Sequence, residues 1–142
     1  MATATMTSAC GGVAVVAADQ ATKWAAPSLD RTAIGAAIEP GLNRDYSLGL
    51  VGGSQTLLIL GALVALGLGG WWAAQSVRSG RVPAWVGALV LGGAMSNLLD
   101  RIIRGGVLDF IVTPWIVLNL ADLAVVAGLA AFSVAHLRLE RR

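Results

Sequence analysis

The sequence is poor in the residues that build most metal and redox centres. Among its 142 residues are one cysteine and one histidine, Cys10 and His136. A single cysteine excludes a disulfide framework and a cysteine metal site within the chain, and the apolar neighbours of Cys10 predict a free residue in the core. The sequence also contains no Gly-x-x-x-x-Gly-Lys phosphate loop. We therefore expect no metal and no cofactor.

Charged side chains are scarce as well. They make up 13% of the chain, against 56% hydrophobic residues, and the mean hydropathy is +0.75. Such a chain has too few polar residues to cover a soluble domain of this size, so an integral membrane protein is predicted. The net charge of +2 is too small to indicate a nucleic-acid partner. No repeat or polar linker divides the sequence, which predicts a single domain over residues 1–142.

Four apolar runs are long enough to cross a bilayer, because about 20 helical residues span a core of roughly 30 Å. They predict membrane helices at about 9–26, 56–76, 82–103 and 119–137. In the polar stretch 27–55, short apolar groups on either side of Pro40-Gly41 predict two short strands around a turn. The expected fold is an all-α membrane protein, a four-helix bundle with a small β-containing loop.

The arginines and tryptophans predict how the chain sits in the membrane. Four spans put both termini on one side, and that side holds Arg78, Arg81, Arg138, Arg141 and Arg142, against Arg31, Arg44, Arg101 and Arg104 on the other. Because basic loops favour the inner side, we expect cytoplasmic termini and an extracytoplasmic loop 27–55. The tryptophans fall at the two expected interfaces, Trp71, Trp72 and Trp85 at one and Trp24 and Trp115 at the other.

Four aspartates gather at one side of this topology. Asp19, Asp100, Asp109 and Asp122 all lie near the outer ends of the spans, whereas the span centres carry no charge. An ionisable group at membrane depth costs roughly 3 kcal/mol on insertion scales, so such groups mark places that a structure or a function uses. The outer ends of the spans are therefore where we expect the functional site.

Two of these acids have ready structural interpretations. Asp19 and Lys23 are four residues apart, a spacing that suits either a helical ion pair or a contact that shapes the site. Asp100 lies at a helix C-terminus, where the helix dipole disfavours an acid, so it needs a partner. A hydrogen-bond hub is the favoured interpretation, with Arg104 one turn away.

The other two acids suggest a chemistry. Asn119 and Asp122 have the spacing of an N-cap and its N3 acid, whereas Asp109 has no evident capping role. Two carboxylates that converge at a partly dehydrated site share one proton, so one can draw a proton from water while the other protonates a departing amide nitrogen. Asp109 and Asp122 are the predicted pair for such peptide hydrolysis. His136 is expected near the opposite end of the last span, too far away for a Ser/His arrangement or a zinc site.

The polar motifs resemble the lipoprotein signal peptidase (signal peptidase II) family, aspartyl proteases of the bacterial plasma membrane. The family's Asp-Gln-x-x-Lys signature corresponds to residues 19–23, and its Asn-x-Ala-Asp signature to residues 119–122. The central signatures, Gly-Gly-Ala-x-Gly-Asn-x-x-Asp-Arg and Gly-x-Val-x-Asp-Phe, correspond to residues 92–101 and 105–110. In this order, with four spans, the motifs cover almost the whole chain.

The resemblance implies a substrate, a place and a role for each motif residue. The implied reaction removes the signal peptide of a lipoprotein precursor just before a cysteine that carries diacylglyceryl. The implied catalytic dyad is Asp109 with Asp122, and the implied supporting and substrate-binding residues are Asp19, Lys23, Asn43, Asn97, Asp100, Arg101 and Asn119. We expect a monomer among the lipids of the bacterial plasma (inner) membrane, its site near the outer leaflet under a small β-rich extracytoplasmic cradle.

The sequence departs from the family pattern in three places. Ser96 replaces a glycine, Leu118 replaces a phenylalanine, and residues 44–48 differ from the usual sequence after the family's asparagine, here Asn43. Two other functions therefore stay open. One is an inactive relative that binds lipoprotein signal peptides without cutting them. The other is a small proton-coupled carrier, against which the uncharged span centres argue.

Overall fold

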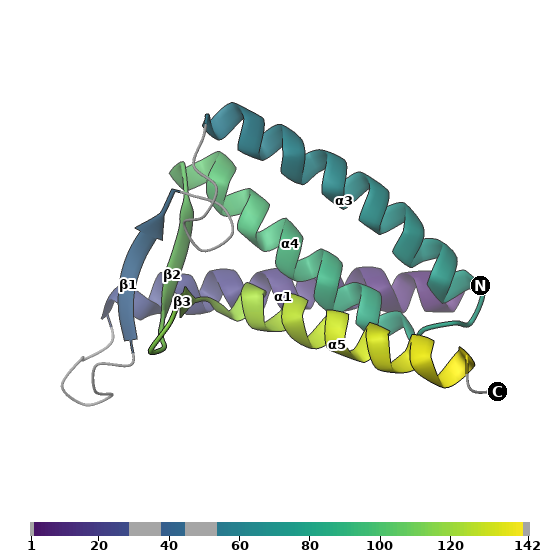
Figure 1. Cartoon of the computed structure of the whole chain (residues 1–142). Coiled ribbons are helices and arrows are strands. Elements are labelled where there is room, and N and C mark those ends of the chain that lie inside the picture. Colours follow the sequence, from purple (N-terminus) through teal and green to yellow (C-terminus); the bar gives the residue numbers. More distant parts are fainter. Residues whose placement is uncertain (1, 29–37, 45–53, 141–142) are drawn as a thin grey trace.

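The computed structural model describes residues 2–28, 38–44 and 54–140. Four long helices run side by side, and a small sheet lies across one end of them (Figure 1). Both termini lie at the other end. The helices are α1 (Ala2–Ala25), α3 (Gln55–Arg78), α4 (Ala84–Arg104) and α5 (Leu120–Glu140), with a 3-10 turn η1 (Ala26–Ser28) after α1. The strands are β1 (Ile38–Asn43), β2 (Val107–Val112) and β3 (Val117–Leu118).

The helices lie where the apolar runs predict them, within a few residues except at the start of α1, which begins at Ala2 rather than at residue 9. Among the described residues, three helical segments are long and apolar enough to cross a membrane: Gln55–Arg78, Ala84–Arg104 and Leu120–Arg138. Helix α1, which carries Asp19 and Lys23, is not among them. The turns between elements use glycine in the left-handed region, at Gly80 between α3 and α4 and at Gly105 after α4.

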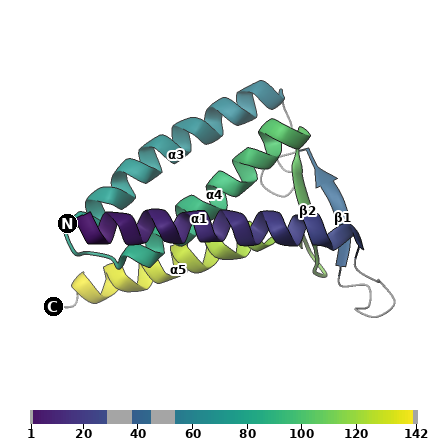
Figure 2. The ribbon, with the colours of Figure 1, turned by 180° about the vertical axis from the view of Figure 1, so that it is seen from behind.

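Helix α4 is the centre of the bundle and lies between α3 and α5 in both views (Figures 1 and 2). It approaches α1 and α5 closely at two adjacent glycines. A Cβ atom at Gly92 would stand 2.8 Å from the carbonyl oxygen of Gly12, and one at Gly93 would stand 2.5 Å from that of Ala121. Because any side chain would push the helices apart there, these glycines fix the separation of α4 from its neighbours. Asp122 follows Ala121 directly, so this contact also sets its position.

The sheet is antiparallel with the order β1-β2-β3. Asn43 pairs with Val107 and Gly41 with Asp109, and the register shifts between Ile38 and Gly41. The prediction that Pro40-Gly41 forms a turn between two strands is wrong, since both residues lie within β1. An edge strand with an irregular register tolerates a proline, which has no N–H to donate to a neighbour.

The rest of the sheet comes from the segment between the third and fourth predicted helices, for which the sequence indicates no strand. Strands β2 and β3 are formed by residues 107–118, with the bend between them at Pro114 and Trp115. The predicted second strand near Tyr46 to Leu50 lies outside the described residues.

The helices expose apolar side chains over their outer faces, as lipid-facing helices do. On α3 the exposed fractions of Leu57, Val64 and Leu68 are all above 60%. Cys10 is also exposed, on the outer side of α1, so its predicted place in the core is wrong. Trp24 and Trp115 are 83% and 88% exposed, and Trp71 is 66% exposed. These exposed tryptophans suit the headgroup region of a bilayer.

Candidate active site

Asp109 lies on β2, the central strand, and is buried with 5% of its surface exposed. One carboxylate oxygen, Oδ1, accepts a hydrogen bond of 2.6 Å from Asn119 Nδ2, and the other, Oδ2, accepts one of 3.0 Å from Asn43 Nδ2. Burial raises the pKa of Asp109 above its ordinary value of 3.8. The two amide hydrogen bonds oppose this rise in pKa, while the nearby charge of Asp122 adds to it. The β2 carboxyl is therefore predisposed to hold a proton.

Asp122 lies in the first turn of α5 and forms a reciprocal cap with Asn119. The backbone N–H of Asn119 donates to Asp122 Oδ2 at 3.1 Å, and the backbone N–H of Asp122 donates to Asn119 Oδ1 at 2.9 Å. The predicted N-cap is thus confirmed. The other carboxylate oxygen of Asp122 accepts a hydrogen bond of 2.8 Å from Asn97 Nδ2. Since the Asn119 amide also binds Asp109, one asparagine holds both carboxylates.

Both carboxylates line the same cavity, of about 730 Å³, between α3, α4, α5 and the sheet. Its wall is apolar along the helices, with residues such as Leu66, Val90 and Val126. Five polar side chains gather at the end near the sheet, namely Asn43, Asn97, Arg101, Asp109 and Asp122. A second cavity of about 630 Å³ lies over the sheet. Three residues line both cavities: Asn43, Asp109 and Ile116. An extended chain on the sheet and an apolar chain along the helices would therefore meet beside the two carboxylates.

A second polar cluster is packed between α1 and α4, next to these carboxylates. Lys23 is 1% exposed, and its Nζ atom lies 2.7 Å from Asp19 Oδ2 and 2.7 Å from Asp100 Oδ2. Both aspartates are fully buried. Asp19 also accepts hydrogen bonds from Ser96 Oγ at 2.7 Å and from the backbone N–H of Ala121 at 2.8 Å. The cluster thus ties the first turn of α5 to α1.

Asp100 is the hydrogen-bond hub that its position in the sequence predicts. It pairs with Arg104 one turn away as well as with Lys23. Its carboxylate accepts a hydrogen bond of 2.8 Å from Gln20 Nε2 and one of 3.3 Å from the backbone N–H of Leu108 on β2. Asp100 therefore links α1, α4 and the strand that carries Asp109.

Asn97 connects the two clusters. Its Oδ1 atom accepts hydrogen bonds from Lys23 Nζ at 3.0 Å and from Asn119 Nδ2 at 3.1 Å, while its Nδ2 donates to Asp122. Arg101, one turn along α4, donates from Nη1 to the Asn97 carbonyl at 3.3 Å and is 8% exposed at the cavity wall.

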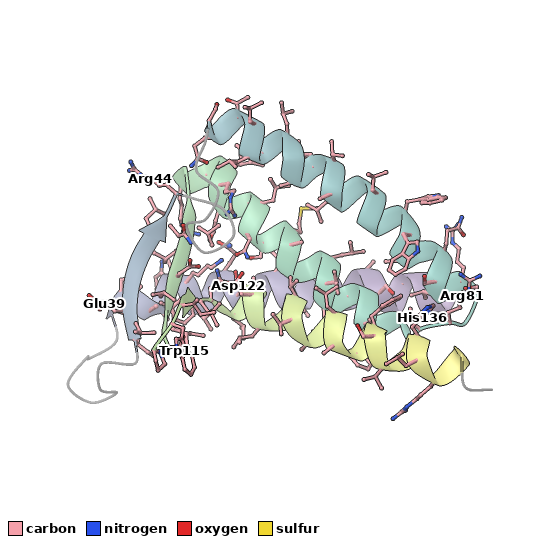
Figure 3. The ribbon with its side chains drawn as sticks, viewed as in Figure 1. Glu39, Arg44, Arg81, Trp115, Asp122 and His136 are labelled. Carbon is pink, nitrogen blue, oxygen red and sulfur yellow. The ribbon has the colours of Figure 1, made fainter. Side chains whose placement is uncertain are left out.

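All nine residues that the sequence singles out meet at the sheet end of the bundle. Gln20 and Ser96, for which the sequence predicts no role, also belong to the buried cluster. Gln20 Nε2 donates a hydrogen bond of 3.0 Å to Ser96 Oγ. The signal for both was a polar side chain within an otherwise apolar helix. His136 lies at the opposite end of the molecule from Asp122 (Figure 3). In the described part of the chain, no three His, Cys, Asp or Glu side chains gather as possible metal ligands.

Comparison with known proteins shows the family. A model of the Signal peptidase (SPase) II family matches residues 12–138. The chain belongs to the signal peptidase II family. A lipoprotein signal peptidase of Xylella fastidiosa is 35% identical over 136 residues, which cover 82% of this chain and 79% of that protein. One of Halalkalibacterium halodurans is 32% identical over 106 residues, which cover 70% of this chain and 67% of that protein.

The fold has a counterpart among solved structures. A structure described as a bacterial membrane enzyme superposes with a TM-score of 0.72 at 21% identity, covering 93% of this chain and 88% of the other. This likeness shows a shared fold, and three of the described helices are long and apolar enough to cross a membrane.

Proposed function

We propose that this chain is an aspartyl endopeptidase that removes signal peptides from diacylglyceryl-modified lipoprotein precursors, with Asp109 and Asp122 as its catalytic dyad. The observation that carries the proposal is the joint placement of these two carboxylates. They come from different elements, line one cavity and are both held by Asn119. Membership of the signal peptidase II family supports the substrate class.

The surroundings of the two carboxyls suggest which one acts as acid and which as base. Burial raises the pKa of Asp109, so we assign the shared proton of the resting site to Asp109. Asp122 then acts as the base: it takes a proton from water as the water oxygen attacks the scissile carbonyl. Asp109 gives its proton to the amide nitrogen as the carbon–nitrogen bond breaks. Water is consumed, a carboxyl and an amine are formed, and the dyad regains its starting state when the proton returns to Asp109.

The shape of the cavity supports a lipidated substrate. Its apolar walls on α3, α4 and α5 would take the acyl chains or the apolar signal peptide, and its polar end would take the scissile bond. We assign Asn43, Asn97 and Arg101 to the walls that orient the dyad and the substrate, and Asn119, buried behind them, to the support of both carboxylates. Asp19, Lys23 and Asp100 hold those walls in place.

We further propose the arrangement in the membrane. In this proposal α1 is a fourth span beside α3, α4 and α5, and residues 1–142 form one monomeric domain in the bacterial plasma membrane. Both termini face the cytoplasm, and the dyad and the β-rich cradle face the outer leaflet. The exposed Arg78, Arg81 and Arg138 at the end that carries the termini support this orientation.

The test is cleavage of a diacylglyceryl-modified precursor by the purified chain in liposomes, compared with Asp109→Asn and Asp122→Asn. Asparagine keeps the shape of aspartate but cannot exchange the catalytic proton. Glu39→Gln, an exposed acid on β1 that lines the cavity over the sheet but not the larger cavity of the dyad, is the control for loss of a carboxylate charge.

The proposal predicts cleavage just before the lipidated cysteine by the wild type and the control, with binding but no cleavage by both dyad variants. Normal cleavage by either variant would refute the dyad. A wild-type chain that binds several precursors without cutting them would support the inactive relative instead. Proton flux through protein-containing liposomes would support the carrier.

A further inference from the structure

A third cavity lies at the end of the bundle that carries the termini, away from the aspartates. It measures about 520 Å³ and opens between the first half of α1, the end of α3 and the first half of α4. Its wall is made by small and aliphatic side chains, including Ala9, Val13, Ala74 and Leu91. None of the four aspartates at the sheet end lines it, so the proposed peptidase does not use it.

This third cavity is a groove between α1, α3 and α4, and it exists because the side chains on its three sides are short. Helices α1 and α4 touch at Gly12 and Gly92, which form its floor. Across from them, α3 presents the small side chains of Ala73 and Ala74, followed by Val77 and Arg78. Water in such a groove would find few hydrogen-bond partners, so within a bilayer an acyl chain is the natural occupant.

Two polar side chains lie in this wall, Ser8 and Arg78. The Ser8 hydroxyl donates to the Ala84 carbonyl at 2.9 Å, so its donor is already used. Arg78 is the last residue of α3, is exposed, and forms no ion pair with any carboxylate whose side chain the structure describes. The groove therefore combines an apolar body with an uncompensated positive charge at its mouth.

The side chains around the mouth suit the headgroup region of a bilayer. Arg81, three residues after Arg78, is exposed at the same end of the bundle (Figure 3). Trp71 and Trp85 are 66% and 51% exposed nearby on α3 and α4, as expected for side chains at a membrane interface. An anionic headgroup at this depth would lie beside two guanidinium groups, while its acyl chain continues into the groove.

From this combination we propose that one anionic phospholipid binds between α1, α3 and α4. Its acyl chain lies along Val13, Ala74 and Leu91, and its phosphate lies against Arg78, with Arg81 beside it. The lipid fills the gap between α1 and α3 and so holds the two helices together at the end remote from the sheet. The inference is independent of the proposed peptidase activity.

The test is native mass spectrometry of the full chain in detergent with phosphatidylglycerol or phosphatidylcholine of identical acyl chains. Arg78→Gln removes the charge, and Ala74→Phe fills the groove from an exposed position. Arg138→Gln and Ala130→Phe are the matched controls, since both residues are exposed on α5 and line none of the cavities described above.

We expect one tightly retained phosphatidylglycerol per wild-type chain and much weaker retention of phosphatidylcholine. Arg78→Gln should weaken retention of phosphatidylglycerol about fivefold, the effect of one basic residue near an anionic surface. Ala74→Phe should abolish it, and both controls should retain the lipid as the wild type does. Equal retention of the two lipids, or unchanged retention by Ala74→Phe, would overturn the proposal. Cleavage of a lipidated precursor should be unaffected by Ala74→Phe in detergent, which separates this site from the peptidase site.

Discussion

The four aspartates at the sheet end form two pairs that differ in what balances their charge. The inner pair, Asp19 and Asp100, is fully buried and shares the ammonium group of Lys23 at 2.7 Å from each carboxylate. The outer pair, Asp109 and Asp122, lines the large cavity and accepts hydrogen bonds from side-chain amides, those of Asn43, Asn97 and Asn119.

In the proposed function, this difference separates acids that hold the structure from acids that do the chemistry. A carboxylate against a buried cation cannot give up its charge without leaving that cation unpaired, so it serves to fix helices together. A carboxylate held by neutral amides beside a second carboxylate can take up and release a proton. The residue type is the same in both pairs, and the partners and the access to the cavity distinguish them.

The largest effect should come from removing the cation of the inner pair. Lys23→Met leaves two buried carboxylates without their shared partner, which should cost about 3–5 kcal/mol of folding free energy. We expect a greatly lowered melting temperature in detergent. The double variant Lys23→Met with Asp19→Asn should recover part of that loss in folding free energy. A Lys23→Met variant as stable as the wild type would show that the inner pair does not stabilise the fold.

The next effect should come from the side chain that joins the two pairs. Asn97→Ala removes the donor to Asp122 and the acceptor of Lys23 and Asn119. Loss of these three hydrogen bonds, at about 1 kcal/mol each, should slow precursor cleavage about 100-fold. Ile102→Ala, exposed on the same helix, is the control and should cut at the wild-type rate. Equal cleavage rates for the two variants would show that Asn97 does not support the outer pair in cleavage.

A smaller effect on the free energy of unfolding is expected when the inner pair loses one hydrogen bond but keeps its cation. Ser96→Ala removes the hydroxyl that donates to Asp19 at 2.7 Å but leaves the ion pair with Lys23. Unfolding should require about 1–2 kcal/mol less, with cleavage of folded protein unchanged. Ser133→Ala, at an exposed serine on α5, controls for the loss of a helix hydroxyl. A large loss of activity without loss of stability would contradict the division into pairs.

The smallest effect should be a displacement of the pH profile. Asp109 must be protonated, so activity is lost as the pH rises through its pKa. The Asn43 hydrogen bond lowers the pKa of Asp109, so Asn43→Ala should raise that pKa and move the basic limb of kcat/KM to higher pH. Glu39→Gln on the same strand should leave the limb in place. A limb that moves to lower pH would exclude Asp109 as the acid.

The sequence predicts those features that are local in the chain. Apolar runs predict the four helices, and the spacing of Asn119 and Asp122 predicts the cap that the structure contains. The spacing of Asp19 and Lys23 likewise predicts an ion pair, which forms at 2.7 Å. Each of these contacts spans at most one helical turn, so no knowledge of the fold is needed.

Contacts between distant segments could not be predicted this way. The second partner of Lys23, Asp100, reaches it because α1 and α4 pack together at their glycines, and spacing along the chain carries no sign of this. Strands β2 and β3 were missed because strand pairing is decided by a partner elsewhere, here β1. The strand placement of Asp109 and its bond to Asn119 follow from the same pairing.

The central claim is that the outer pair performs the chemistry and the inner pair supports the structure. The most direct test measures melting temperature and precursor cleavage side by side for four variants: Asp19→Asn, Asp100→Asn, Asp109→Asn and Asp122→Asn. We predict lowered melting temperatures for the inner two, and for the outer two a melting temperature near that of the wild type with no detectable cleavage. Cleavage by either outer variant at the wild-type rate, or abolished cleavage in fully stable inner variants, would contradict the account.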